Sequence, residues 1–291
     1  EQRDHDGSSR GAGPAPTTIV AAGSAGKFLL YAPRAMRIVT WNINSLNARK
    51  DFAALFLDQV APDVLALQEL KLETDKVPRE LFESRGYHVA IFGQAKWNGV
   101  AIAAKAPISD VITGVSGDEG ESRLLAATID GIRFVDVYCP QGQTADSDKF
   151  AYKLRFYDAL IGWLEGQDPM APMVLLGDFN VAPAPEDIYD PIGLAGVPSF
   201  HPLEHERWKR LEAWGAIDVV KPHVKPGAFS FWDYRAGDFH QNRGMRIDHV
   251  LATRPVAERV ERAEILRDWR KKKEGLTPSD HAPVIVHLRP A

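Results

Sequence analysis

The sequence has a single cysteine, Cys139, among its 291 residues. One thiol excludes an intrachain disulfide framework and a cysteine-rich zinc site, and so little cysteine is typical of a reducing compartment such as the cytoplasm. Long hydrophobic runs are also missing, since no stretch approaches the roughly 18 apolar residues that a membrane-spanning helix needs. Residues 17–31 are mildly apolar but are interrupted by Gly23 and Gly26, and the opening residues lack the basic start of a signal peptide. We therefore expect a soluble, cytoplasmic, monomeric protein with no membrane partner.

The sequence also lacks an excess of positive charge. Lys and Arg together number 35 and Asp and Glu 39, which gives a net charge of −4. Nucleic-acid binders are often basic, because neutralising phosphates supplies much of their affinity. The balance here gives no indication of tight stoichiometric DNA binding. It is compatible with a nuclease, because metal-binding carboxylates add negative charge and turnover requires product release.

The chain divides into two regions of different composition. Residues 1–35 are rich in Gly, Ala, Ser and Pro and have no periodicity, which predicts a flexible N-terminal extension. Residues 36–291 are predicted to form one continuous domain of mixed sheets covered by helices, because short apolar strands alternate there with segments of helical periodicity. Closely spaced apolar runs leave almost no room for helices between them and predict adjacent antiparallel strands at 88–92, 99–105, 124–130 and 132–138. Further strands are expected at 36–42, 64–69, 173–176, 246–252 and 283–288, and helices at 51–60, 147–165 and 204–214.

Polar side chains stand directly after several of the predicted strands. Asn42 and Asn44 follow the first strand, Glu69 ends the second, and Asp178 and Asn180 follow the strand at 173–176. Residues two apart in an extended chain point to the same side, and residues beyond the strand ends of an α/β sheet line the crevice where ligands bind. These side chains are therefore predicted to face a common site.

Three further candidates lie near the C-terminus. Asp248 falls within the strand at 246–252, and Asp280 and His281 come just before the final strand. Each has an ordinary explanation when taken singly, because a carboxylate after a strand is more often a turn residue or a helix cap than a ligand. The occurrence of all of them in this order favours a catalytic or metal-binding site.

The segments around these residues carry a family resemblance. The blocks TWNINSL, LALQELK, WNGVAIAAK, YCPQGQ, LLGDFNVAP, FSFWDYR, NRGMRIDHVLA and PSDHAPV resemble the signature blocks of exonuclease III-type abasic-site endonucleases, within the endonuclease/exonuclease/phosphatase superfamily. GDFN and SDH occur across that superfamily, whereas QE-x-K, FxFWDYR and the RGxRID block are more specific to its DNA-repair branch. The resemblance runs from residue 36 to the C-terminus. It implies an α/β four-layer sandwich, in which two mixed β-sheets pack face to face with helices on the outside.

The resemblance also implies a metal site. Glu69 matches the main Mg²⁺ carboxylate ligand, Asn44 a position that supports the metal, and Asp280 a second ligand or part of the hydrogen-bond shell. Mg²⁺ favours one or two carboxylates together with waters and phosphate oxygens, which suits so sparse a set. Mn²⁺ is the alternative ion.

Catalytic roles follow from the same blocks. Asp178 matches the residue that aligns or deprotonates the attacking water, and Asn180 its orienting neighbour. His281 matches a hydrogen-bond donor to the scissile phosphate, with Asp248 behind it to fix its tautomer and raise its basicity. Tyr138 matches a donor to a phosphate oxygen or to the leaving group.

Substrate contacts are implied at further positions. Asn42 is expected to hold the phosphate or a carboxylate partner. Phe231, Trp232 and Met245, with Ile247, occur where the family builds a pocket for a flipped-out abasic sugar, although aromatic and apolar residues in strands are also ordinary core residues. Positions expected to face the DNA backbone are Lys71, Lys149, Lys153, Arg243 and the basic run 267–273.

The function implied is Mg²⁺-dependent hydrolysis of the DNA backbone 5′ to abasic sites, giving a 3′-hydroxyl, together with 3′→5′ exonuclease and 3′-phosphatase activity. The partner is then double-stranded DNA with abasic sites or blocked 3′ ends. Two alternatives stay open. A phosphoesterase acting on inositol phosphates or sphingolipid headgroups would share Asn42, Glu69, Asp178, Asn180 and His281, and a non-catalytic DNA-binding protein could keep the same fold.

Overall fold

The computed structural model describes residues 35–116 and 120–290. The predicted extension at residues 1–35 lies outside this part of the chain except for Ala35, so its flexibility stays a prediction. The described residues form two six-stranded mixed sheets, in the orders β11-β12-β1-β2-β4-β3 and β5-β6-β7-β8-β10-β9. The first sheet comprises β1 (Met36–Asn42), β2 (Val64–Gln68), β3 (His88–Phe92), β4 (Val100–Ala104), β11 (Val260–Ile265) and β12 (Val284–Leu288). The second comprises β5 (Ser109–Thr113), β6 (Leu124–Ile129), β7 (Ile132–Tyr138), β8 (Met173–Asp178), β9 (Ile217–Asp218) and β10 (Asp248–Ala252).

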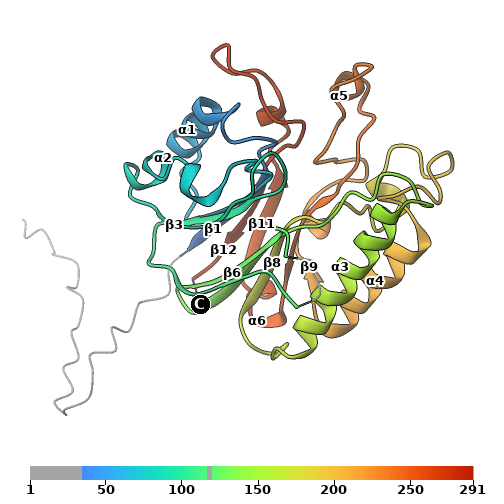
Figure 1. Ribbon diagram of the computed structural model, residues 1–291, viewed down its shortest axis with the longest axis horizontal. Helices are drawn as coiled ribbons and strands as arrows, with labels where there is room; N and C mark the ends of the chain where they lie inside the picture. Colours follow the sequence, from blue (N-terminus) through green and yellow to red (C-terminus); the bar gives the residue numbers. More distant parts are fainter. Residues whose placement is uncertain (1–34, 117–119, 291) are drawn as a thin grey trace, which may run out of the picture. The chain divides into compact units, whose positions relative to one another are not determined.

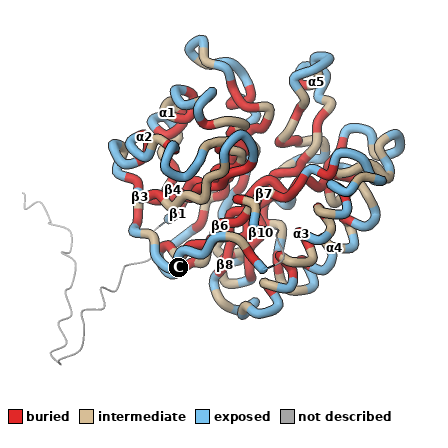
Figure 2. The backbone as a smooth tube through the Cα atoms, in the orientation of Figure 1, coloured by how far each residue is buried: buried red, intermediate tan, exposed pale blue. Residues whose placement is uncertain are grey.

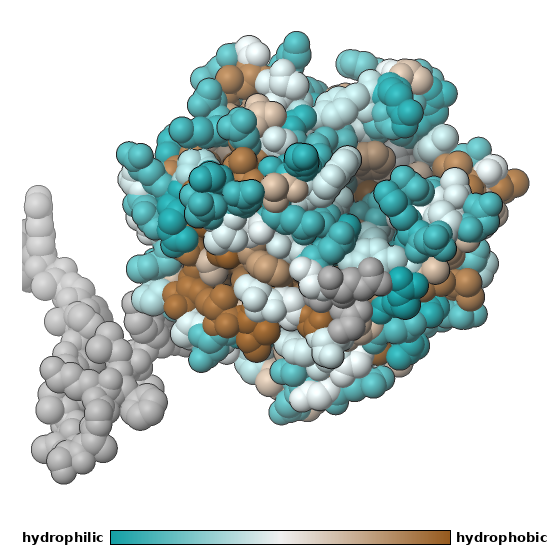
Figure 3. All heavy atoms as spheres, in the orientation of Figure 1, coloured by the Kyte–Doolittle hydropathy of each residue, from teal (hydrophilic) through white to brown (hydrophobic). Residues whose placement is uncertain are grey.

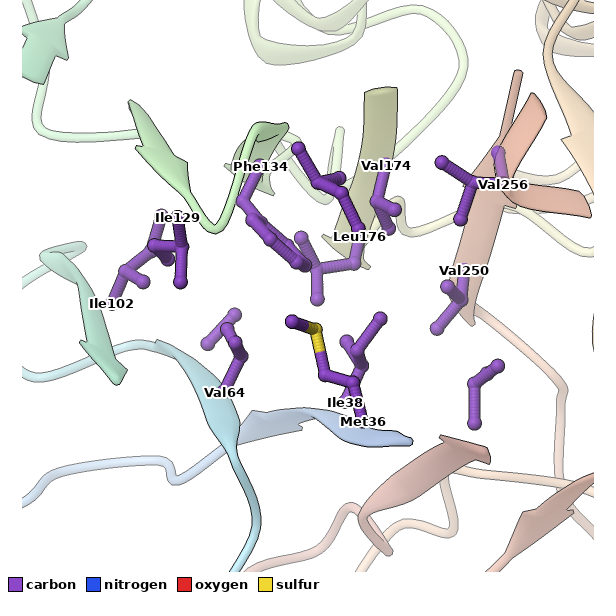
Figure 4. Close-up of a cluster of buried hydrophobic side chains, with 14 of the residues drawn as sticks. Met36, Ile38, Val64, Ile102, Ile129, Phe134, Val174, Leu176, Val250 and Val256 are labelled. Carbon is purple, nitrogen blue, oxygen red and sulfur yellow. The ribbon is translucent and has the colours of Figure 1, made fainter. Parts of the chain in front are cut away.

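The two sheets pack face to face around an apolar core. Alternate side chains of each strand enter this core, as the strand pleat requires. Ile38 and Val64 from the first sheet meet Phe134 and Leu176 from the second in one buried cluster (Figure 4). Buried backbone is concentrated where the sheets face each other, and exposed backbone lies mainly in the helices and connecting loops (Figure 2). Packing of these inner faces fixes the separation of the sheets and of the strand ends.

Helices cover the outer faces and complete four layers (Figure 1). Phe56 of α1 packs between Trp41 of β1 and Trp269, with ring centroids 5.0 and 4.8 Å apart. On the other side, α3 begins after Ser147, whose hydroxyl accepts from the Phe150 amide as an N-cap. The helices are α1 (Lys50–Gln59), α2 (Glu80–Glu83), α3 (Asp148–Glu165), α4 (Pro202–Trp214), α5 (Asp238–Gln241) and α6 (Arg254–Ala257), with short 3₁₀ turns η1 (Thr74–Lys76), η2 (Pro185–Asp187), η3 (Lys221–His223) and η4 (Arg267–Arg270). The four-layer sandwich expected from the sequence is confirmed.

One part of the predicted strand order is wrong. The runs at 99–105 and 124–130 form β4 and β6, which are not neighbours, because β4 pairs with β2 and β3 while β6 pairs with β5 and β7 in the other sheet. An apolar run buried on both faces is compatible with either sheet, so spacing alone could not assign it. Three edge strands, β5, β9 and β11, were not expected from the sequence either. β5 is exposed throughout, β9 has two residues, and β11 carries the charged residues Glu261, Arg262 and Glu264, so these edge strands have a weak hydrophobic signal.

The edges β3 and β5 border a groove of about 760 Å³, whose apolar lining includes Val89, Ile91 and Ile108. Figure 3 shows hydrophobic side chains gathered on the visible face in the region of β3 and β6. None of the described helices has the length and apolar character needed to cross a membrane.

The topology brings together the strand ends that carry the predicted site residues. They lie along one side of the sandwich, where strands of both sheets end, and we call this side the shared edge. β1 and β2 are parallel with Asn42 opposite Gln68, and β7 and β8 are parallel with Tyr138 opposite Asp178. β10 runs antiparallel to β8 and starts at this edge, with Asp248 opposite Asp178. β12 runs antiparallel to β1, so the segment before it also reaches this edge. Residues scattered along the chain therefore converge there.

Close backbone packing beside this edge gives a stability prediction. Gly177 of β8 has φ +146°, and a Cβ added there would overlap the carbonyl oxygen of Val137 in β7. We expect Gly177→Ala to lower the free energy of unfolding by about 1–3 kcal/mol, measured by denaturant unfolding. Gly162→Ala in α3 is the matched control, because a Cβ there meets no atom within 4 Å. An equal stability of the two variants would contradict the close approach.

Candidate active site

Three predicted site residues meet at the shared edge. Single ligand atoms of Glu69, Asp178 and His281 all lie within 4.8 Å of one another. Glu69 follows β2, Asp178 ends β8 and His281 precedes β12, so both sheets contribute. Asp178 and His281 are buried and Glu69 is partly exposed, which leaves the group open to the surface on the Glu69 side.

A buried amide joins the two carboxylates. Nδ2 of Asn42 donates to Oε1 of Glu69 at 2.8 Å and to Oδ2 of Asp178 at 2.9 Å. Its Oδ1 accepts from the backbone amide of Asn44 at 3.0 Å. Asn44 and Glu69 have positive φ values of 46° and 55°, so the chain turns sharply just after each strand and directs these side chains inward. The structure thus places Asn42 as a partner of the carboxylates.

Glu69 is charged because Lys71 lies beside it. Nζ of Lys71 is 2.8 Å from Oε2 of Glu69 and donates to Oδ1 of Asn44 at 2.7 Å. Burial favours the neutral acid, but the Lys71 charge and the hydrogen bonds from Lys71 and Asn42 outweigh it and lower the pKa of Glu69. Lys71 was expected to face the DNA backbone. The structure places its ammonium group against Glu69 and Asn44, and its side chain also lines the cleft that opens from Glu69, so contact with DNA stays a prediction.

Asp178 lies deeper and has the opposite balance. Burial is the largest influence and raises its pKa to about 7, while the His281 charge and the Asn42 hydrogen bond act against it. Its Oδ1 accepts from the backbone amide of Asn180 at 2.9 Å. Nδ2 of Asn180 donates to the carbonyl of Cys139 at 2.9 Å, which ties the end of β7 to the loop after β8. A carboxylate with a pKa near neutrality can accept a proton at physiological pH.

His281 is held by Asp248. Nδ1 of His281 lies 2.9 Å from Oδ2 of Asp248, and its Nε2 lies 3.9 Å from Oδ2 of Asp178. Burial disfavours the imidazolium, but the charge and hydrogen bond of Asp248, with a contribution from Asp178, outweigh it and raise the pKa of His281 to about 10. The backbone is fixed as well, since Trp41 Nε1 donates to the His281 carbonyl at 3.2 Å. The protonated ring therefore presents an N–H to the site at neutral pH.

The sequence pattern of the Endonuclease/Exonuclease/phosphatase family matches residues 39–281. The chain belongs to this family. It is 34% identical over 273 residues to exodeoxyribonuclease III of Haemophilus influenzae, a match that covers 87% of this chain and 100% of that relative. Exodeoxyribonuclease of Bacillus subtilis is 29% identical over 259 residues, covering 86% of this chain and 98% of the relative.

Solved structures of similar proteins share the whole fold. The 3′ phosphatase NExo from Neisseria, bound to a product DNA hairpin, is 35% identical with a TM-score of 0.83, covering 87% of this chain and 99% of that one. An AP endonuclease from Archaeoglobus fulgidus is 34% identical with a TM-score of 0.81, again covering 87% and 99%. The resemblance inferred from the sequence blocks is confirmed, and the chain is an enzyme of the hydrolase class.

The group formed by Glu69, Asp178 and His281 could hold a metal ion. The donor set fits a hard divalent cation, because the carboxylate oxygens of Glu69 and Asp178 are the ligands that such ions prefer. His281 is the third member of the group, and its Nδ1 is engaged by Asp248. Asp280 lies beside this group, with its Oδ1 accepting from Nδ2 of Asn44 at 2.9 Å. The side chain of Asn44 thus bridges Lys71 and Asp280.

A cleft of about 380 Å³ opens from Glu69. Tyr138 and the exposed Lys149 line it, as do Trp97 and Arg123, which sequence reasoning missed. The Arg123 guanidinium lies 4.9 Å from the centre of the Tyr138 ring. Burial, followed by the nearby Glu69 and Asp178 charges, raises the pKa of the Tyr138 phenol well above its usual range, so the hydroxyl remains a donor. Arg123 ends the polar run 116–123, whose composition is typical of an ordinary connecting loop, and this explains why it gave no signal of a site.

The residues predicted to contact the sugar divide into two groups. Phe231 and Met245 are half-buried neighbours that form a short antiparallel bridge, and the Phe231 ring lies 4.8 Å from the His281 ring. Both pack against a small apolar cluster that includes Ile247. Trp232 is fully buried and packs edge-on against Phe239 at 5.1 Å. Its indole therefore belongs to the core and cannot touch a substrate.

Several basic residues expected to face DNA are engaged within the protein. Lys153 has no exposed surface and pairs with the equally buried Glu204. Arg243 pairs with Asp238 at 2.9 Å. Within the run 267–273, Arg270 is buried and donates to the carbonyl of Trp232 at 3.2 Å, while Lys271 and Lys273 both pair with Asp268. Among Lys71, Lys149 and Lys153, which were each predicted to face DNA, Lys149 is exposed.

The Asp248–His281 pair gives a testable prediction. Asp248→Asn removes the carboxylate that raises the pKa of His281 most, so we expect that pKa to fall from about 10 toward the ordinary value of about 6.5. The imidazolium would then be lost as the pH rises through neutrality instead of through the alkaline range. NMR titration of the imidazole nitrogens in EDTA measures this shift, with the other histidines as internal controls. An unchanged His281 titration would show that Asp248 does not set its charge.

Proposed function

We propose that this protein is a metal-dependent DNA-repair phosphodiesterase that cuts the backbone 5′ to abasic sites and clears blocked 3′ ends. The single observation that carries the proposal is the meeting of Glu69, Asp178 and the Asp248-bound His281 within one small group. Two carboxylates of unequal pKa beside a fixed imidazolium can bind a cation, accept a proton from water and donate to a phosphate. Relatives 34–35% identical over nearly their full length carry the names exodeoxyribonuclease III, 3′ phosphatase and AP endonuclease, which supports DNA as the substrate.

The metal proposed is Mg²⁺, with Mn²⁺ as the alternative. Glu69 is the principal ligand, held in place by Asn42 and Lys71, and Asn44 and Asp280 form the adjoining shell. The bound ion would neutralise charge on the phosphate oxygens and so lower the barrier to attack at phosphorus.

The chain's own residues then divide the remaining tasks. Asp178 is a buried carboxylate that Asn42 and the backbone amide of Asn180 hold in position, and it receives the proton of the attacking water. His281 donates an N–H to a phosphate oxygen, and Tyr138 donates to a phosphate oxygen or to the departing 3′ oxygen. Attack in line with the bond 5′ to the abasic sugar yields a 3′-hydroxyl and a 5′-deoxyribose phosphate.

The lesion is proposed to be selected by Phe231 and Met245. They present an apolar surface beside His281 that suits a baseless sugar and offers no polar partner to an intact base. Lys149, at the mouth of the cleft lined by Tyr138, is proposed to contact the DNA backbone. Asn42 acts by aligning the carboxylates rather than by touching the phosphate.

Incision of a duplex with one tetrahydrofuran site is the direct test. We expect cleavage in Mg²⁺, loss of cleavage in EDTA, and recovery when Mg²⁺ or Mn²⁺ is added back. A 3′-phosphorylated duplex tests the 3′-end activity in the same buffer. Hydrolysis of inositol phosphates or sphingomyelin without DNA incision would replace the proposal with the phosphoesterase alternative. DNA binding without hydrolysis of any of these substrates would establish the non-catalytic one.

A substitution tests the role of Asp178. Asp178→Asn keeps the size of the side chain but removes the proton acceptor, so kcat should fall roughly 10²–10⁴-fold while the Kd for the duplex changes little. Asp130→Asn is the matched control, because Asp130 lies in an exposed turn at the far end of β7. Near-normal turnover by Asp178→Asn would reject the assignment.

A further inference from the structure

The loop after β8 follows Asp178 directly, contains Asn180 and has an unusual set of hydrogen bonds. Its backbone carbonyls belong neither to a helix nor to a strand ladder, yet each of four consecutive carbonyls accepts from a side chain of another element. The donors and acceptors are Tyr157 Oη to Phe179 O at 2.6 Å, Lys153 Nζ to Asn180 O at 2.7 Å, His249 Nε2 to Val181 O at 2.8 Å and His205 Nε2 to Ala182 O at 3.0 Å. We call these four donors the carbonyl clamp.

The donors of the carbonyl clamp come from three elements. Lys153 and Tyr157 lie four residues apart on α3, and therefore on one face of the helix. His205 lies on α4 and His249 on β10. The loop is therefore held by hydrogen bonds from the outer helices α3 and α4 and from the neighbouring strand β10.

The other contacts of His249 and Lys153 hold these two side chains in place as donors to the loop. Nδ1 of His249 lies 3.1 Å from the Arg246 guanidinium, which can only donate, so the ring proton is on Nε2 and points at Val181. Lys153 is fully buried and pairs with Glu204, and a second N–H reaches the Gln141 carbonyl at 3.2 Å. Burying such an ion pair is seldom favourable for stability alone. Its location beside the loop indicates a positional role.

The hydrogen bonds that hold the loop also help to orient the Asp178 carboxylate. Asn180 has φ 52°, and its backbone N–H donates to Oδ1 of Asp178 at 2.9 Å. That N–H belongs to the same peptide group as the Phe179 carbonyl, which accepts from Tyr157, and the next peptide group is held through its Asn180 carbonyl by Lys153. The other carboxylate oxygen is held by Asn42. Both oxygens of Asp178 are therefore oriented, one of them through the loop.

We propose that the carbonyl clamp, formed by Lys153, Tyr157, His249 and His205, is a set of positioning residues that orient Asp178 and Asn180 for water attack. None of the four touches the group formed by Glu69, Asp178 and His281 directly. The inference rests on the proposed function for its kinetic consequence. Because a misplacement of about 1 Å can cost about 10²-fold in rate, loosening the loop lowers kcat while substrate binding is kept.

Tyr157→Phe is the sharpest test, with Tyr87→Phe as its matched control. Each variant removes one hydroxyl that donates to a backbone carbonyl, Phe179 for Tyr157 and Pro62 for Tyr87, at 2.6 and 2.7 Å, and both tyrosines are buried. We expect similar falls in Tm for the two variants. On the tetrahydrofuran duplex, Tyr157→Phe should lose about 10-fold or more in kcat with KM within about 2-fold of wild type, whereas Tyr87→Phe should keep its kcat.

A rescue pair covers the case in which Tyr157→Phe fails to fold. His205 is partly exposed, and His205→Gln keeps an N–H that can reach the Ala182 carbonyl, whereas His205→Ala does not. We expect His205→Ala to lower kcat and His205→Gln to restore most of it. Equal loss in both variants, or none in either, would overturn the carbonyl clamp.

A second readout separates this inference from the proposed function. Hydrogen exchange of the Asn180 amide reports directly on its bond to Asp178 and needs no substrate. Faster exchange in Tyr157→Phe than in Tyr87→Phe supports the carbonyl clamp even if wild-type protein fails to cut DNA, an outcome that would overturn the proposed function alone. Equal exchange and equal kcat in the two variants would overturn the carbonyl clamp and leave the proposed function intact.

Discussion

The site depends on one constraint, which is that two carboxylates share the amide of Asn42 in a largely buried setting. Two negative charges at so short a distance repel each other, and burial adds to the free-energy cost of each charged carboxylate. Lys71 compensates the charge on Glu69, while the protonated His281, itself held by Asp248, compensates that on Asp178. This division leaves Glu69 with a lowered pKa and Asp178 with a raised one. Two residues of nearly the same chemistry are thereby prepared for different tasks.

This arrangement requires the sandwich. Asn42 and Glu69 come from the first sheet and Asp178 and Asp248 from the second, so their distances are set by the apolar core between the sheets. The outer layers contribute as well, because α3 and α4 supply the side chains that hold the loop after β8. A helix that serves first to bury a sheet face also determines how a carboxylate in the site is oriented.

Much of this could be predicted from the sequence, for identifiable reasons. Strand alternation and the polar residues after β1, β2 and β8 gave the strands and the candidate site, and the quoted blocks gave the family. The assignment of β4 and β6 to neighbouring positions was wrong, because an apolar run does not encode its partner. Lys153 was expected at the DNA surface because a basic residue looks the same in sequence whether it meets solvent or a buried carboxylate. Arg123 gave no signal at all, since its importance comes only from lying over Tyr138.

The sequence by itself determined the residue types at the strand ends, the alternation that forms two apolar sheet faces, and the family. These features are local, since each is written in a few neighbouring residues. Only the tertiary structure decided that Asn42 joins Glu69 to Asp178, that Lys71 pairs with Glu69, and that Trp232 is core. It also decided that side chains of α3 and β10 donate hydrogen bonds to the loop that contains Asn180. Protonation and orientation depend on burial and on partners distant in the chain, and these exist only once both sheets have packed together.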